Sequence, residues 1–344
     1  MLQLKNESPF EAAITVFPNE NAIDTLYVVV KSTFLLGNKI EVAEEQLPIV
    51  MADEYWGEPG QSSLKYGSEL HLLKPSTDIV MIGEACAPEK RPVTGLDVLL
   101  AIADRKKTVR VFGDRQWASG IIGLKITPPK PFDSMPLVYE RAFGGIHELD
   151  SDKQKVLFEA RNPVGKGFKG KRKTRELKGT MLPNLEDPAH LISSPGDRPA
   201  PACFGYVAPS WEPRKSFAGT YDEAWQQKRV PYLPEDFDNR FFTAAHPDLI
   251  SSNYLKGGEP VAITNMSPNG PLKFKLPVCD IKAAVRIAGK TENPHLNLET
   301  VLIEPNKTRL SMLWRTGVQC DKKTLKVEQV DISLKSLQIN GRTA

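Results

Sequence analysis

The residues from Thr25 to Leu36, TLYVVVKSTFLL, constrain the fold more than any other stretch of the chain. β-Branched and aromatic residues dominate this run, and such residues favour an extended strand over a helix. Apolar side chains occupy both alternating faces, which is typical of a central strand covered on two sides. A shorter run of the same kind, Ala12 to Phe17, precedes it across the turn-forming sequence PNEN. We therefore expect a buried β-sheet in this part of the chain.

Runs of this type recur at both ends of the chain and are scarce in the middle. Two neighbouring pairs predict hairpins, one across the charged sequence DRKK and one across PNKT. The further predicted strands are Asp78 to Ala87, Asp97 to Ala103, Thr108 to Phe112, Ile121 to Thr127, Val261 to Asn265, Leu272 to Leu276, Ile281 to Ala288, Leu298 to Glu304, Arg309 to Trp314 and Leu325 to Ile332.

Proline and glycine are frequent in this chain of 344 residues, at 28 and 24. Because proline is excluded from helix interiors and central strands, its abundance predicts many turns and ordered irregular segments. No long helical pattern separates the strands, which argues against alternating β–α units. We predict a mainly β fold: β-sandwich-like antiparallel sheets with long irregular Pro/Gly-rich connections and one or two short helices. Residues 1–344 are expected to form a single integrated domain.

The middle of the chain lacks strand periodicity. From Asp150 to Pro201 it predicts a long surface loop or a partly disordered insertion within the domain. A nucleic-acid-binding arm is an alternative, but no aromatic residues for base stacking are interleaved with its basic residues. The best helical stretch follows at Thr220 to Lys228, with Thr220 as the expected N-cap and Glu223 completing a capping box. The basic cluster consists of Lys166, Lys169, Lys171, Arg172, Lys173, Arg175 and Lys178.

The sequence lacks the motifs of common catalytic and metal sites. It has no GxSxG, HExxH or GxxxxGK[ST] pattern, and its four cysteines are too scattered for a zinc site. We therefore predict no catalytic residues, no cofactor and no metal. One enzyme alternative stays open: a hydrolase or carbohydrate-active protein on a β-sandwich, using His246 with the carboxylates of Glu235 to Asp238.

Charge and hydropathy limit the expected location and partners. A net charge of +3 is too small to imply nucleic-acid binding by itself. The N-terminal sequence MLQLKNESPFEAAITVF lacks the basic and apolar regions of a secretion signal, and no apolar stretch reaches membrane-spanning length. We expect a cytoplasmic protein whose partners are neither nucleic acids nor membranes.

A dense run of aromatic residues beside charges extends from Phe204 to Phe242. Aromatic side chains with arginines among them match the composition of protein-interface hot spots. The alternative is that the aromatic side chains pin an irregular segment onto the β core. The two interpretations are compatible, since different residues of the run can serve each purpose.

Several stretches together resemble the family catalogued as domain of unknown function 2169, which is encoded in bacterial type VI secretion gene clusters. The resemblance covers nearly the whole chain in order. The stretches are VVVKSTFLL, DEYWGEPGQSSLKYGSEL, KPSTDIVMIGEA, VFGDRQW, MPLVYERAFGG, RNPVGKGF, LPNLEDP, the block from Pro201 to Leu249, GGEPVAITNMSPNGPLKFKLP and LETVLIEPNKTRLSMLWR.

This resemblance implies a cytoplasmic adaptor or chaperone that binds an effector toxin, or its PAAR-repeat portion, and assists its loading onto the VgrG-type spike. A structural component exported with the spike is an alternative. The family supplies no catalytic residues to carry over. In the stretch YERAFGG, Arg141 is expected to pair with a carboxylate nearby or on a partner, and the double glycine permits a sharp turn. The partner-binding candidates are Arg141, Trp211, Arg214, Tyr221, Trp225, Asp236, Asp238, Arg240, Phe241 and Phe242.

Overall fold

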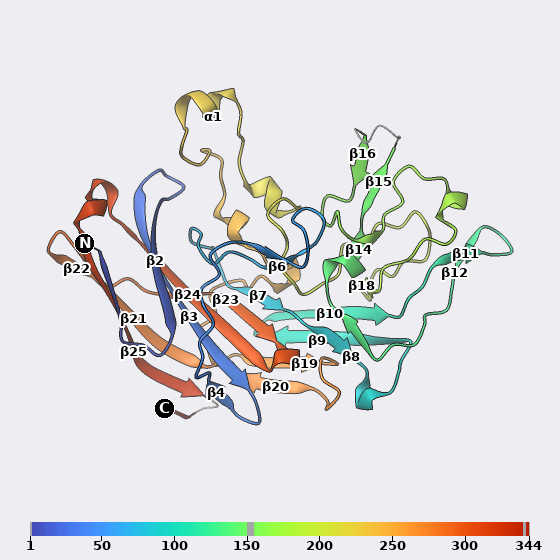
Figure 1. The fold of residues 1–344 in the computed structure, drawn as a ribbon, viewed down its shortest axis with the longest axis horizontal. Helices are drawn as coiled ribbons and strands as arrows, with labels where there is room; N and C mark the ends of the chain where they lie inside the picture. Colours follow the sequence, from blue (N-terminus) through green and yellow to red (C-terminus); the bar gives the residue numbers. More distant parts are fainter. Residues whose placement is uncertain (1, 150–154, 340–341, 344) are drawn as a thin grey trace.

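The computed structural model describes residues 2–149, 155–339 and 342–343. Strands make up 42% of it and helices 10%, so the predicted mainly β class is confirmed. Figure 1 shows three large sheets side by side, with α1 (Glu223–Lys228) and several hairpins projecting from them. Within the described ranges α1 is the one α-helix, and no helix is long and apolar enough to cross a membrane.

The central sheet is built around the apolar run from Thr25 to Leu36. Its strand order is β2 (Glu11–Pro18), β3 (Asp24–Leu36), β24 (Arg309–Gln319), β23 (Asn297–Glu304) and β7 (Asp78–Met81), with β4 (Ile40–Val42) also paired to β3. Pairing is antiparallel except between β23 and β7. The interior of β3 is buried along its length, and β23 and β24 form the hairpin predicted across PNKT.

Two further sheets flank the central one. The first contains β18 (Leu185–Glu186), β10 (Arg105–Phe112), β9 (Gly95–Ile102), β19 (Pro260–Thr264) and β20 (Leu272–Lys275), in that order. Its β9–β10 hairpin is the one predicted near DRKK, although the strands extend further and only Ala103 and Asp104 form the turn. The second contains β1 (Gln3–Asn6), β25 (Val327–Ile339), β21 (Val278–Ile287) and β22 (Lys290–Glu292), with β26 (Arg342–Thr343) paired to β25.

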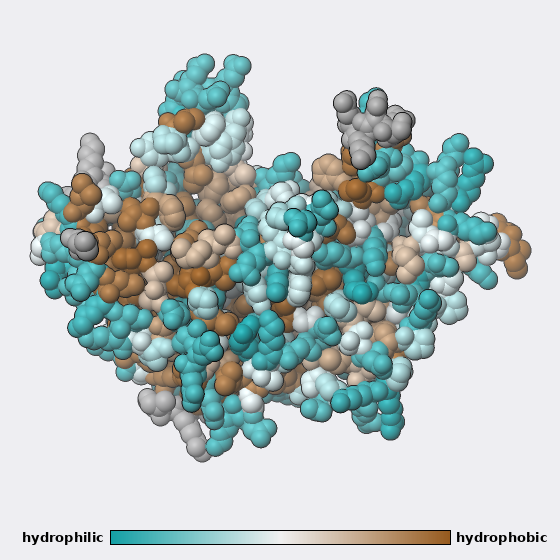
Figure 2. Space-filling model, in the orientation of Figure 1, coloured by the Kyte–Doolittle hydropathy of each residue, from teal (hydrophilic) through white to brown (hydrophobic). Residues whose placement is uncertain are grey.

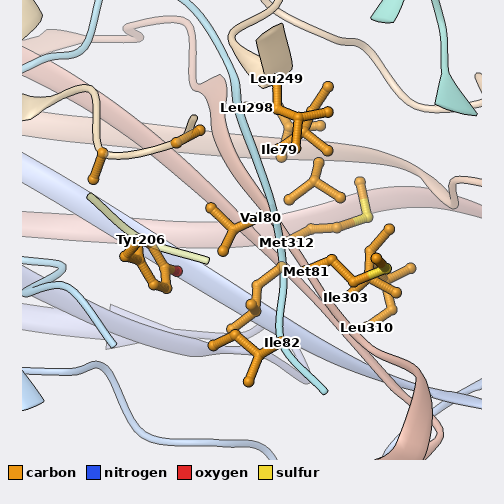
Figure 3. Packing of buried hydrophobic residues seen from close by; sticks show 14 of the residues in the cluster. Ile79, Val80, Met81, Ile82, Tyr206, Leu249, Leu298, Ile303, Leu310 and Met312 are labelled. Carbon is orange, nitrogen blue, oxygen red and sulfur yellow. The ribbon is translucent and has the colours of Figure 1, made fainter. Parts of the chain in front are cut away.

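Strand β7 shows how the sheets share one core. Figure 3 shows Ile79 and Met81 on one side of the strand and Val80 and Ile82 on the other. All four side chains are buried, as expected for a strand covered on both faces. The predicted strand Asp78 to Ala87 is interrupted, because the chain leaves the central sheet after β7 and starts β8 (Glu84–Cys86), which pairs with β13 (Ser134–Pro136).

The central sheet also buries ion pairs. Arg315 Nε lies 2.7 Å from a Glu299 carboxylate oxygen, and both side chains are 0% exposed. Lys74 and Asp78 lie 2.6 Å apart and are nearly as buried. Burial raises the pKa of Glu299, while Arg315 and Lys74 act against that rise. Buried charges of this kind are tolerated only when they are paired, so these residues tie β23 and β24 to the segment before β7.

The segment predicted as a loop from Asp150 to Pro201 has structure of its own in its described part, 155–201. It contains β16 (Val156–Phe158), β17 (Lys166–Gly167), η3 (Thr174–Leu177) and β18. β16 pairs with β15 (Ile146–Glu148), and β17 pairs with β14 (Phe143–Gly144). We call residues 117–126, 143–149 and 155–192 the lobe. A second small core holds the lobe together: Trp117, Phe143, Phe168, Leu177, Leu182 and Ile192.

Two local predictions need correction. The helix begins at Glu223 and not after Thr220, because the Asp222 side chain caps it by accepting a hydrogen bond from Trp225 N at 2.8 Å. The strand predicted from Ile121 is only β12 (Leu124–Ile126), which pairs with β11 (Trp117–Ser119). The flanking glycines at 120 and 123 place Ile121 and Ile122 in the turn between these two strands.

Candidate functional site

The structure divides the predicted binding residues into a buried group and an exposed group. Trp211 is buried and packs edge-on against Tyr139, with 5.4 Å between ring centroids. Arg214 is also buried, and it donates hydrogen bonds to the carbonyls of Phe241 and Val207 at 2.8 and 2.6 Å. Trp211 and Arg214 therefore fasten this irregular segment to the core and present no surface to a partner.

Phe241 and Phe242 hold an intermediate position. Phe242 stacks on the buried His71 ring at a centroid distance of 5.2 Å, and Phe237 contacts both phenylalanines. Their side chains are half-buried. They anchor the base of the segment that follows Arg214, which is the scaffolding role expected for part of the aromatic run.

The exposed group lies on a projection that carries α1, visible at the top of Figure 1. We call residues 218–240 the aromatic arm. Tyr221 and Trp225 pack against each other at 4.6 Å, and Trp225 Nε1 donates to the Tyr232 carbonyl at 2.9 Å. The two predicted acids are used inside the arm, because Asp236 accepts from Thr220 and Asp238 pairs with Arg240 at 2.6 Å. The hydrogen bonds from Thr220 lower the pKa of Asp236, and the one from Arg240 lowers that of Asp238.

Arg141 lies elsewhere, on the wall of a groove of about 610 Å³ that we call the motif groove. The residues around the groove come from five separate parts of the chain, and all of them fall in stretches that carry the family resemblance. The lining residues are Trp56, Lys65, Ile82, Gly83, Glu84, Pro136, Val138, Glu140, Arg141, Lys166, Glu304, Asn306 and Lys307.

One wall of the motif groove is fixed by Glu140. This carboxylate accepts hydrogen bonds from the backbone N and the hydroxyl of Ser63, at 2.6 and 2.7 Å. Ser63 precedes β6 (Leu64–Tyr66), which pairs with β5 (Glu54–Tyr55). This short hairpin presents Trp56, whose surface is 46% exposed, and Lys65, whose ammonium lies 5.0 Å from the Trp56 ring centroid.

A second wall is fixed by Asn162. Its side-chain amide donates to the carbonyls of Tyr139 and Phe143, at 2.8 and 3.0 Å, and the residue is fully buried. Gly144 makes this approach possible, because a Cβ at that position would lie 2.0 Å from the Asn162 carbonyl oxygen. The parallel pairing of β14 with β17 then places Lys166 beside the turn that carries Arg141.

Asn306 closes the groove on the opposite side. Its Oδ1 accepts from Glu84 N at 2.8 Å, which holds the loop between β7 and β8 against η7 (Pro305–Lys307). A Cβ on Gly83 would lie 2.1 Å from that same oxygen, so glycine is needed for the contact. The groove is therefore assembled by three hydrogen-bonding side chains, each joining two of its walls.

The charges in the motif groove are unevenly compensated. Although burial alone would raise its pKa, Glu304 is held below its ordinary value by hydrogen bonds from Tyr66, Lys307 and Arg309. In contrast, Lys65, Arg141 and Lys166 have no carboxylate oxygen within 4 Å among the residues that the structure describes.

The environments of Arg141 and Lys166 favour an anionic group in the groove. The Arg141 guanidinium donates to the neutral Asn184 side chain at 3.2 Å. Burial and then the neighbouring Arg141 lower the pKa of Lys166. A carboxylate from another molecule would relieve the repulsion between these two cations and gain charge-assisted hydrogen bonds.

The residues named for the enzyme alternative are not in direct contact. His246 is buried, and its hydrogen-bonding neighbours are Lys107, Pro201 and Asp248. Of the carboxylates proposed to assist it, Asp236 and Asp238 are bonded within the aromatic arm. Burial, followed by the nearby Lys107, lowers the pKa of His246 to about 4.

Sequence reasoning missed most of the motif groove. Trp56, Lys65 and Lys166 were absent from the predicted site, although each lies in a stretch that carried the resemblance. A lone tryptophan followed by Gly-Glu-Pro-Gly was the available signal, since a large aromatic side chain on a turn-rich segment has little sheet to pack into.

Comparison with known proteins gives one family and no closer relative. No curated protein and no solved structure matches the chain. One family profile, described as an uncharacterized protein conserved in bacteria (DUF2169), matches residues 21–315. The match spans most of the chain and includes every residue of the motif groove. The chain therefore belongs to the DUF2169 family of bacterial proteins.

Proposed function

We propose that this protein is a cytoplasmic adaptor, or chaperone, that binds a type VI secretion effector or its PAAR-containing portion and helps to load it onto the VgrG-type spike. The observation that carries the proposal is the motif groove. Five stretches that are distant in the chain and shared with the family resemblance meet around one partly open surface. Family-wide stretches that converge on a surface, and not only on the core, favour a common binding task.

The chemistry of the groove indicates the kind of client segment that it takes. Trp56 offers an exposed aromatic face, and the half-buried Pro136 and Val138 add apolar surface. The three uncompensated cations line the same groove. We propose that an extended client segment places an apolar side chain against Trp56 and a carboxylate between Arg141 and Lys166. Tryptophan and arginine are among the residue types enriched at interface hot spots.

Co-purification tests the proposal directly. Tagged protein is recovered from bacteria that express a complete type VI secretion gene cluster that includes it. The bound proteins are then identified by mass spectrometry. We expect an effector or a PAAR protein to be captured by the wild type. The double variant Trp56→Ala, Arg141→Glu should lose it, because both the aromatic anchor and a cation are removed. Lys273→Glu with Lys275→Glu, on the exposed side of edge strand β20, is the matched control and should retain capture.

The outcomes separate adaptor from non-adaptor. Capture of no effector or spike component by the wild type would reject the proposed function. Equal capture by the wild type and the groove variant would support an adaptor function but reject the motif groove as its docking surface. Recovery of the protein itself in the secreted fraction, dependent on a working secretion system, would instead favour a component exported with the spike.

A further inference from the structure

Two adjacent isoleucines stand at the end of a hairpin with their side chains in solvent. Ile121 and Ile122 have relative accessibilities of 106% and 94%, the largest aliphatic exposures of the lobe that contains β11 and β12. Gly120 N donates to the Gly123 carbonyl at 2.9 Å and closes the turn. We call residues 120–123 the isoleucine tip. Figure 2 shows it as hydrophobic colour at the right-hand end of the molecule, where the β11–β12 hairpin ends in Figure 1. Single exposed apolar residues are ordinary, but a fully exposed pair on a projecting turn indicates a contact.

The hairpin that carries the isoleucine tip is hydrogen-bonded to the residues directly after the basic segment 166–178, which we call the basic loop. Trp117 N donates to the Thr180 carbonyl at 3.0 Å, and Gly179 N donates to the Trp117 carbonyl at 2.7 Å. Leu124, in the strand after the tip, packs on the small core that includes Leu177 of η3. The tip and the end of the basic loop are therefore parts of one packed unit.

The basic loop is almost purely cationic. Its cations are Lys166, Lys169, Lys171, Arg172, Lys173, Arg175 and Lys178, and Glu176 is the single carboxylate. None of these cations has a carboxylate oxygen within 4 Å in the part of the chain that the structure describes. Lys171, Lys173, Arg175 and Lys178 are exposed. A surface of the opposite charge would therefore be attracted without breaking any ion pair.

We propose that this face of the lobe binds an anionic lipid surface. The isoleucine tip inserts among the headgroups and acyl chains, and the exposed cations of the basic loop, Lys171, Lys173, Arg175 and Lys178, lie over the negative charges. The expectation that no membrane is a partner rested on the absence of a spanning segment, and a peripheral contact needs none. Lysines and arginines close to a negatively charged leaflet each add to the attraction.

The composition favours a lipid over a protein as the occupant. Protein interfaces are depleted in lysine, and their hot spots are enriched in tryptophan, tyrosine and arginine. The contact face here combines two aliphatic residues with five lysines and two arginines, so lysine is its commonest cation. The aromatic residues of the lobe core, Trp117, Phe143 and Phe168, are buried. A projecting aliphatic turn also needs no complementary pocket in a fluid acyl layer, whereas a protein partner would have to supply one.

Vesicle sedimentation of the full chain tests this proposal. The probes are vesicles of phosphatidylcholine alone and of phosphatidylcholine mixed with phosphatidylglycerol. We expect sedimentation with the anionic vesicles only, and weaker binding at high salt because the charge attraction is screened. Ile121→Ser with Ile122→Ser should lower the partition coefficient on the order of 100-fold, since two aliphatic side chains no longer leave water. Lys171→Glu, Lys173→Glu and Lys178→Glu together should abolish the preference for anionic vesicles.

Matched controls keep the test specific. Leu325→Ser removes an equally exposed aliphatic side chain outside the lobe and should bind vesicles as the wild type does. A wild type that stays in the supernatant with both kinds of vesicle would overturn the proposal. So would tip variants that sediment like the wild type. If those variants instead lose capture of a protein and vesicles never bind, the tip is a protein contact and the lipid proposal is rejected, while the motif groove proposal is unaffected.

Discussion

The central sheet and the aromatic arm draw on similar residues but use them in different ways. In the central sheet, apolar side chains of β3 and β7 are buried on both faces, and even charged residues such as Arg315 are fully enclosed. In the aromatic arm, Tyr221 is exposed, Trp225 is only partly covered, and Arg240 pairs with Asp238 at the surface. The same residue types therefore stabilise the fold in one region and are available for contacts in the other. Burial of the side chain decides whether a residue stabilises the fold or is available for contacts.

The largest difference should appear when one arginine is removed from each region. Arg315→Met leaves Glu299 buried without its partner, and we expect it to lower the free energy of unfolding by about 3–5 kcal/mol. Arg240→Met breaks an exposed, solvent-screened pair and should leave the free energy of unfolding nearly unchanged. Urea unfolding of both variants measures the difference. Similar losses in the two variants would show that the arm is as integral to the fold as the sheet.

Acid pH should weaken the buried regions specifically. Burial lowers the pKa of His71, and burial lowers that of His246 to about 4, from an ordinary value of 6.5. The unfolded chain therefore binds more protons than the folded one in this window. The two neutral histidines therefore do not reduce the free energy of unfolding above about pH 6.5. As the pH drops toward 4, the free energy of unfolding falls by up to about 1.4 kcal/mol per pH unit for each histidine.

The matched variant for this pH effect is His71→Gln with His246→Gln. We expect the free energy of unfolding of this variant to fall less than that of the wild type between about pH 6.5 and pH 4. Chemical unfolding of both proteins at each pH measures the difference. A decline as steep as that of the wild type would assign the acid sensitivity to other groups.

A smaller effect on the free energy of unfolding is expected at the contact between Gly83 and Asn306, where two walls of the motif groove meet. Gly83→Ala places a methyl group against the Asn306 side chain and should cost about 1–3 kcal/mol of stability through overpacking. Asn306→Ala loses the hydrogen bond to Glu84 N. Because the two changes disturb one contact, the double variant should cost less than their sum, which a double-mutant cycle measures. Strict additivity would show that the contact is not shared.

The smallest stability effect belongs to the arm. Trp225→Ala removes the ring packing with Tyr221 and the bond to the Tyr232 carbonyl, both of which stay within the arm. We expect the melting temperature to remain nearly unchanged, and client binding to weaken if the arm makes a second contact. A large drop in melting temperature, seen by differential scanning fluorimetry, would place Trp225 in the structural core.

The comparison also explains how much could be predicted from the sequence. Central strands such as β3 and the β23–β24 hairpin were predictable, because their apolar pattern and turn residues act locally. The N-cap was misplaced by two residues, since Thr220 and Asp222 are both capable caps and Asp236 engages the first of them. The strand predicted from Ile121 failed because glycines on both sides of the two isoleucines favour a turn.

The candidate site was harder to predict than the fold. Residue type alone did not separate Trp211, which is buried, from Tyr221, which is exposed, because both lie in one aromatic run. The motif groove depends on side-chain contacts between distant segments, such as Glu140 with Ser63 and Asn306 with Glu84. No local pattern encodes such contacts, although the stretches that supply them were recognised from the resemblance.

The most direct test of the central claim is the affinity of the captured client for purified wild-type and variant protein, measured by titration. We predict that Trp56→Ala with Arg141→Glu weakens binding at least about tenfold, the effect of losing about 1.4 kcal/mol. The control Lys273→Glu with Lys275→Glu should bind as the wild type does, and all three proteins should unfold at similar temperatures. A groove variant that binds its client with unchanged affinity would contradict the assignment of the motif groove as the docking surface.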